Sequence, residues 1–171
     1  MKYLSLILLV LGIAGCDSPL KVEGQLPPDN DWNKRIAMIK TPDSLLTKGS
    51  TYLPVYSEIY QRNKNFTFNL TATVSIRNIS LTDTLFLYKA DYYDTHGKLI
   101  KQHLKDPVYV YPMETLEIVV NENDQAGGSG ANFIFDWGVK RDKLTPFFEA
   151  VMISTSGQQG ISFTTHGIRK K

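Results

Sequence analysis

"FTFNLTATVSIRN", residues 66–78, alternates between apolar and polar side chains. An extended chain places alternate residues on one face, whereas a helix would spread them around its circumference. The residues that share the apolar face are Phe66, Phe68, Leu70, Ala72, Val74 and Ile76. The stretch therefore predicts one long β-strand with a buried face and a solvated face, as in an antiparallel sheet.

Similar stretches recur along the chain at intervals of about ten residues. They are "TYLPVYSEIY" (51–60), "LFLYKADYY" (85–93), "KLIKQHL" (98–104), "VYVY" (108–111), "TLEIVV" (115–120), "NFIFDW" (132–137), "FFEAVMIS" (147–154) and "ISFTTH" (161–166). With residues 66–78 they give roughly nine strands, a number typical of a sandwich or barrel. We predict an all-β, antiparallel immunoglobulin-like β-sandwich, with a small β-barrel as the alternative.

A turn signal lies within "DYYDTHGKLI", residues 91–100. Asp94 stands at the first position of a type I turn and Gly97 at the last, where a positive φ is needed. We expect a hairpin between a strand that ends at Tyr93 and a strand that begins at Lys98.

The N-terminus has the features of an exported lipoprotein. Lys2 precedes an apolar run, residues 3–14, which is too short to cross about 30 Å of hydrocarbon but suits a secretory signal. The run ends in "IAGC", which resembles the bacterial lipobox and implies cleavage before Cys16 and acylation of that cysteine. An ordinary secretion signal is the alternative. Since Cys16 is the only cysteine, no intrachain disulfide can form.

The chain is expected to consist of a signal peptide, a tether, one folded domain and a short tail. The boundaries are 1–15 for the lipoprotein signal peptide, 16–49 for the flexible lipid-anchored tether, 50–168 for the β-sandwich and 169–171 for the basic tail. The domain would face the periplasm or the cell surface from the cell membrane or the outer membrane. Asp17 resembles an inner-membrane retention signal of some bacteria, which leaves the choice of membrane open.

The charge balance argues against nucleic-acid binding. The chain carries 19 basic and 17 acidic side chains, and its 42% hydrophobic content is ordinary for a globular protein. A nucleic-acid-binding protein normally shows a basic excess or a basic stripe. The one basic cluster, Arg169-Lys170-Lys171, lies at the extreme end.

"AGGSGANFIFDW", residues 126–137, raises the question of a phosphate-binding loop. Such a loop works because its glycines open a helix whose first N–H groups receive the anion. Here the residues after Gly130 alternate as a strand, so we interpret the glycines as a corner between strands.

No catalytic residues, metal ligands or cofactor are expected. Ser154 or Ser156 with His166 would be the pair to use in a hydrolase, but no Gly-x-Ser-x-Gly elbow is present. His96 and His103 could approach each other, but a zinc site usually needs three or four converging ligands. The protein is therefore expected not to be an enzyme, with an extracytoplasmic hydrolase as the alternative.

Two loops are the candidate contact surface, because loops at sandwich ends commonly carry recognition. The candidate residues are Gly127, Gly128, Ser129, Gly130, Asn132, Ser154, Ser156 and Gln158. The expected partner is an envelope protein or a glycan. A ligand-binding β-barrel with an enclosed apolar cavity is a further alternative.

Several separated motifs resemble a family of small bacterial envelope lipoproteins described only as a domain of unknown function. The motifs, within about residues 50–168, are "YLPVYSEIY", "FNLTATVSIRN", "DYYDTHGKLI", "GGSGANFIFDW" and "EAVMISTSGQQGISFTTHG". The resemblance assigns no catalytic or binding residue. Residues 66–137 also resemble immunoglobulin-like stress-associated domains, which implies a sandwich fold and no activity.

Overall fold

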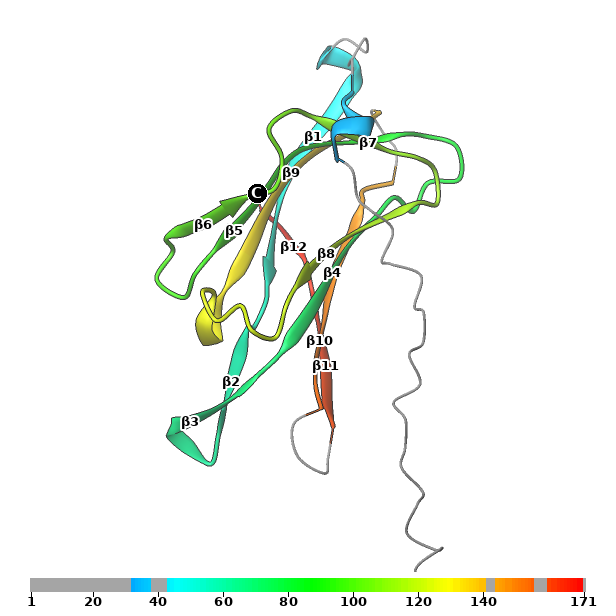
Figure 1. Ribbon diagram of the computed structural model, residues 1–171. Helices are drawn as coiled ribbons and strands as arrows, with labels where there is room; N and C mark the ends of the chain where they lie inside the picture. The colour runs from blue at the N-terminus through cyan, green and yellow to red at the C-terminus, as the bar shows by residue number, and fades with distance from the viewer. Residues whose placement is uncertain (1–31, 38–42, 141–143, 156–159, 171) are drawn as a thin grey trace, which may run out of the picture.

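The computed structural model describes residues 32–37, 43–140, 144–155 and 160–170. Cys16, Ser156 and Gln158 lie outside these ranges. In the described part, two antiparallel sheets face each other and enclose one apolar core (Figure 1). The predicted all-β sandwich is confirmed, and it forms in place of the alternative barrel.

The larger sheet has six strands and the smaller sheet has four. In spatial order the larger sheet contains β12 (Ile168–Lys170), β1 (Leu46–Pro54), β9 (Asn132–Lys140), β5 (Leu85–Tyr93) and β6 (Leu99–Gln102), and β7 (Val108–Val110) also pairs with β5. The smaller sheet contains β11 (Ile161–His166), β10 (Phe147–Ser154), β4 (Thr71–Arg77) and β8 (Thr115–Val120). A separate two-stranded hairpin consists of β2 (Glu58–Gln61) and β3 (Asn63–Asn69).

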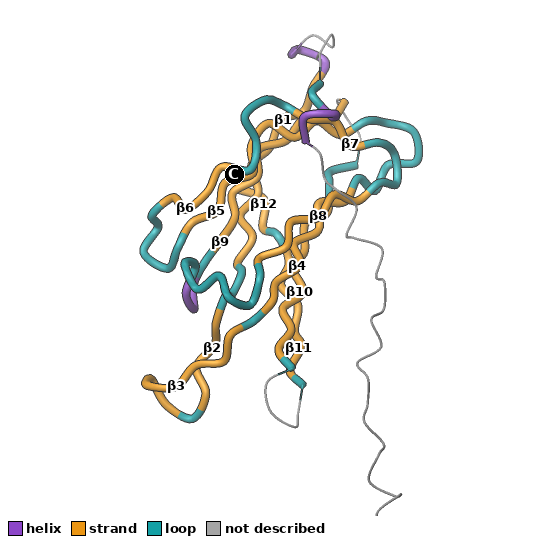
Figure 2. Tube along the Cα trace, viewed as in Figure 1, coloured by secondary structure: helices purple, strands orange, loops and turns teal. Residues whose placement is uncertain are grey.

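Figure 2 shows that the connections gather at two ends of the sandwich. We call the end that carries β7 and the 3-10 helix η1 (Trp32–Arg35) the upper end, and the end that carries the β2–β3 hairpin the lower end. The other short helices are η2 (Asp43–Leu45) and η3 (Gly128–Gly130).

Aromatic side chains from both sheets form the centre of the core. Phe133 and Phe135 stack at 5.5 Å on the inner face of β9, and Phe135 stacks at 4.7 Å on Phe148 of the facing sheet. Tyr92 stacks on Phe133 at 4.7 Å. All four rings are almost fully buried, which is what the alternation of their strands predicts.

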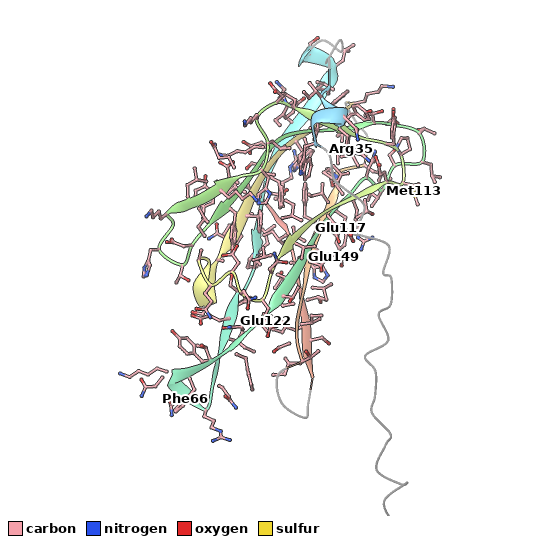
Figure 3. The ribbon with its side chains drawn as sticks, viewed as in Figure 1. Arg35, Phe66, Met113, Glu117, Glu122 and Glu149 are labelled. Atoms are coloured by element: carbon pink, nitrogen blue, oxygen red, sulfur yellow. The ribbon has the colours of Figure 1, made fainter. Side chains whose placement is uncertain are left out.

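The long strand predicted for residues 66–78 is divided at Leu70. Its second half is β4, whose inward residues are buried as expected, but its first half is β3 of the projecting hairpin. The Leu70 N–H donates to the Ser57 carbonyl at 2.8 Å, a bond outside the ladder of the smaller sheet. No facing sheet covers the hairpin tip, so Phe66 is 57% exposed (Figure 3).

The fold extends beyond the predicted domain at both ends. β1 begins at Leu46, and Trp32 packs against the core, although both residues fall within the predicted tether. At the other end, Arg169 and Lys170 pair with β1 as part of β12, although the sequence assigns them to a free tail. The predicted strand at 51–60 is also divided, between β1 and β2. These two divisions and the addition of β12 give twelve strands in the described residues against roughly nine predicted.

The predicted hairpin turn after Tyr93 is confirmed. Gly97 has φ 77°, and its N–H donates to the Asp94 carbonyl at 3.0 Å. The Asp94 carboxylate accepts the N–H groups of His96 and Lys98, each at 2.8 Å. These backbone bonds, that of Lys98 above all, hold the pKa of Asp94 below its usual range.

The fold requires a residue without a side chain at position 49, which Gly49 supplies. It pairs with Trp137, and a methyl group added at Gly49 would lie 2.7 Å from Cη2 of the indole. We predict that Gly49→Ala lowers the free energy of unfolding by about 1–3 kcal/mol, because the buried ring has no room to move. Urea denaturation of the two forms measures the change.

Gly160→Ala is the matched control for that substitution. The nearest atom to a methyl group there, the Ser154 carbonyl oxygen, lies at 3.7 Å, an ordinary contact. Its free energy of unfolding should stay within about 0.5 kcal/mol of the parent. Equal stabilities of the two variants would contradict the packing argument at Gly49.

Candidate functional site

The glycine-rich loop is a packed corner at the start of β9. Gly127 is buried, and a methyl group added there would lie 2.6 Å from the Ser57 hydroxyl and would also overlap the Tyr92 hydroxyl. Those two hydroxyls are hydrogen-bonded to each other at 2.8 Å. A glycine is therefore required by this close approach within the fold.

The polar groups of the loop are used by its neighbours. The Thr95 hydroxyl donates to the Gly127 carbonyl at 3.0 Å and accepts the Gly130 N–H at 2.9 Å. The Ser57 N–H donates to the Gly128 carbonyl at 3.0 Å. The loop forms three residues of 3-10 helix and enters β9 at Asn132, so the helix that a phosphate-binding loop needs does not follow it. Contact of Ser129 and Asn132 with a partner stays a prediction.

Ser154 and His166 are not brought together. Ser154 is the last residue of β10 and pairs with Ile161, whereas His166 pairs with Glu149 at the opposite end of the same two strands. The two positions are five residue steps apart along the strands, about 16 Å. Ser154 is also 4% exposed, so the structure places it in the sheet and not in the contact loop that the sequence predicts.

The histidines and acids around the β5–β6 hairpin do not converge. Among the described residues, no group of three or more metal-ligating side chains occurs. Asp91 is buried, lies 3.3 Å from Lys89 Nζ and accepts a hydrogen bond from the Tyr93 hydroxyl at 3.2 Å. His96 is exposed in the turn, and His103 is half-buried against Phe133 at 5.7 Å between ring centroids.

Burial makes His103 a source of pH-dependent stability. Burial, with a smaller contribution from Lys101 and against the attraction of Asp91, lowers the pKa of His103 to about 4. The unfolded chain therefore binds more protons than the folded chain between pH 4 and the ordinary pKa of 6.5, and stability falls as the pH drops through that range. We predict a loss of about 2–3 kcal/mol between pH 7 and pH 4 from this group.

His103→Gln should remove most of that loss, as measured by urea denaturation at pH 7 and pH 4.5. The control is His96→Gln, since His96 is exposed in the turn. If both variants retain the pH dependence of the parent chain, buried His103 is not its cause.

A groove at the β12 edge of the larger sheet carries several charged side chains. It has a volume of about 1060 Å³ and lies over β12, β1, β9 and β5. Its lining residues are Lys48, Gly49, Ser50, Tyr88, Asp136, Trp137, Arg169 and Lys170. Strand register explains part of this set, because Lys170, Ser50 and Asp136 are paired across three neighbouring strands.

Two cations of the groove lie against aromatic rings. The Arg169 guanidinium lies 5.1 Å from the centroid of Trp137, and the Lys48 ammonium lies 5.5 Å from the centroid of Tyr88. A methyl group at Gly138 would lie 2.9 Å from Cε2 of Tyr88, so this glycine lets the phenol ring approach β9 closely. Cation–π contacts orient cationic groups over the faces of aromatic rings.

Sequence reasoning missed this groove. The period of two places Lys48 and Ser50 on the outer face, but it does not say which strands become neighbours. The decisive strand is β12, which the sequence suggests only as a basic tail. A signal was present in "HGIRKK", where Ile168 and Lys170 alternate with Arg169.

A family model described as "Protein of unknown function (DUF3124)" matches residues 48–169. The chain belongs to the DUF3124 family. The match includes every lining residue of the groove except Lys170, the residue directly after it. It also supports the resemblance to an uncharacterised family that the motifs indicate.

The other comparisons add little to the family assignment. A solved structure titled "Crystal Structure of Thermotoga maritima 1070" is similar at 10% identity and a TM-score of 0.45, over 70% of this chain and 92% of that chain. No curated protein matches the chain. Among the described residues, no helix has the length and apolar character needed to cross a bilayer.

Proposed function

We propose that this DUF3124 protein is a lipid-anchored, non-enzymatic binding module of the bacterial envelope. In this proposal Cys16 carries the acyl chains, and the groove over β12, β1, β9 and β5 receives an anionic group of an envelope glycan or protein. The observation that carries the proposal is the charge of the groove. Lys48, Arg169 and Lys170 line it, and Asp136 is its one acidic lining residue.

The shape of the groove favours an extended ligand. Pockets for small molecules usually measure about 300–1,000 Å³ and enclose most of the ligand. This groove, at about 1060 Å³, lies at the β12 edge of a sheet and opens to solvent. The groove is therefore not the enclosed apolar cavity that a ligand-binding barrel would have. A polymer that carries repeated negative charges fits such a surface.

The hydrolase alternative lacks support of this kind. Ser154 is buried and lies at the opposite end of the β10–β11 strands from His166. The lining of the groove contains Ser50 but no histidine. The described geometry therefore favours recognition.

The anchor is tested by Cys16→Ala in the bacterial host. We expect the parent chain to sediment with membranes and to incorporate a labelled fatty acid, because two or more acyl chains hold a protein stably at a bilayer. The variant should lose the label and remain uncleaved. Fatty-acid labelling and membrane fractionation measure both effects. An unlabelled parent chain that is found in the soluble fraction would exclude the anchor.

The groove is tested by polyanion binding to the purified full chain in detergent. Polyphosphate and polygalacturonate supply phosphate and carboxylate groups, and dextran supplies a neutral polymer. We predict binding to at least one polyanion, weakening as salt rises, and no binding to dextran. Lys170→Glu should lower the affinity about fivefold, since one exposed charge contributes on the order of 1 kcal/mol.

The matched control is Lys64→Glu, which makes the same change of charge on the β2–β3 hairpin, away from the groove. A general electrostatic effect would lower the affinity of both variants equally, and that result would refute a binding site in the groove. Which of the two polyanions binds more tightly identifies the anionic group.

A further inference from the structure

Exposed apolar side chains gather on two neighbouring loops of the upper end. The loop between β4 and β5 presents Ile79 and Leu81, which are 43% and 79% exposed. The loop between β7 and β8 presents Tyr111 and Met113, which are 55% and 64% exposed. We call these four residues the apolar loop pair. Monomeric proteins seldom expose grouped large apolar side chains without a use for them.

Hydrogen bonds hold the two loops together. The Met113 N–H donates to the Ser80 carbonyl, and the Asn78 N–H donates to the Glu114 carbonyl, each at 3.0 Å. The buried Asn78 amide also bonds the carbonyl oxygens of Asp83, Val110 and Tyr111 at 2.8–3.0 Å. The apolar loop pair is therefore a built surface, and its exposure is not the result of a loose chain.

The backbone of Met113 supports the same conclusion. Its φ is 61°, in the left-handed region that residues other than glycine rarely occupy. The bonds from Met113 and Glu114 N–H to the Ser80 and Tyr111 carbonyls keep it there. In this conformation a large apolar side chain stands at the tip of a turn, and such costly backbone states concentrate at functional positions.

The chain enters the fold at this same end. Arg35 of η1 forms an ion pair with Glu114 at 2.7 Å, and Ile36 forms a β-bridge with Val108. Figure 3 shows Arg35 and Met113 at one end of the molecule and Phe66 at the other. Residues 17–31 separate Cys16 from Trp32, and however they are folded they reach no more than about 55 Å.

We infer that the apolar loop pair inserts into the headgroup region of the bilayer that holds Cys16, an inference that rests on the proposed lipid anchor. Leucine and methionine supply apolar tips, and tyrosine has an apolar ring and a polar hydroxyl suited to the interface. The neighbouring charges are paired, Arg35 with Glu114 and Lys140 with Asp83 at 3.1 Å. Insertion therefore leaves these charges with their partners.

Site-specific fluorescence of the lipidated full chain tests this inference. In Leu81→Cys the new thiol carries an environment-sensitive dye, since acylation occupies Cys16. Each chain is reconstituted in vesicles of phosphatidylethanolamine and phosphatidylglycerol, with or without a nitroxide headgroup lipid. Tyr60→Cys is the control, because Tyr60 is 62% exposed on the β2–β3 hairpin at the lower end. Met113→Cys is a second probe in case Leu81→Cys fails to fold.

We expect nitroxide lipid to lower the emission at Leu81→Cys at least about twofold and to leave Tyr60→Cys nearly unchanged. Equal quenching of the two positions, in chains that both sediment with vesicles, would overturn the docking while leaving the anchor intact. A blue shift that appears without vesicles and grows with protein concentration would assign the surface to a second copy and also overturn it. If the chains carry no acyl group and remain in the supernatant when the vesicles are sedimented, the anchor is overturned, and the docking with it.

Discussion

The contact between the Trp137 indole and β1 fixes the register on which the larger sheet depends. The ring lies over Gly49, and its Nε1–H donates to the Thr51 hydroxyl at 2.8 Å, a buried bond. A slip of β1 by one residue would remove that bond and press a side chain against the ring. The same ring receives the Arg169 guanidinium of β12. One buried side chain thus specifies where β1, β9 and β12 lie relative to one another.

The groove at the sheet edge is a consequence of this contact. Because the register is fixed, Lys170, Ser50 and Asp136 come into one row across three strands. Gly49, whose missing side chain this contact requires, is itself a lining residue of the groove. A change that disturbs the core at Trp137 would therefore alter the positions of the basic side chains outside. Stability and recognition are coupled here through shared strands.

The sequence predicts those features that depend on local pattern. Alternation places Ala72, Val74 and Ile76 in the core, and Asp94 with Gly97 makes the expected turn. The predictions that fail concern features set by contacts with residues distant in the sequence. Nothing local distinguishes Phe66, which has no sheet above it, from Val74, which has one, because both continue the same alternation. Ser154 shares the inward face of β10 with Phe148, Ala150 and Met152, and its burial depends on the sheet that faces β10. The groove escaped prediction for the same reason.

The two proposed surfaces have different physical requirements, and different elements of the fold supply them. An insertion surface needs apolar tips on a rigid support, which the loops around Asn78 provide at the upper end. An anion site needs positive charge that a polymer can reach, and the groove lies at the side of the larger sheet. If the upper end touches the bilayer, that face stands roughly upright and remains open to polymers of the surrounding compartment. A groove formed at the upper end itself would lose that access, since the headgroups would cover it.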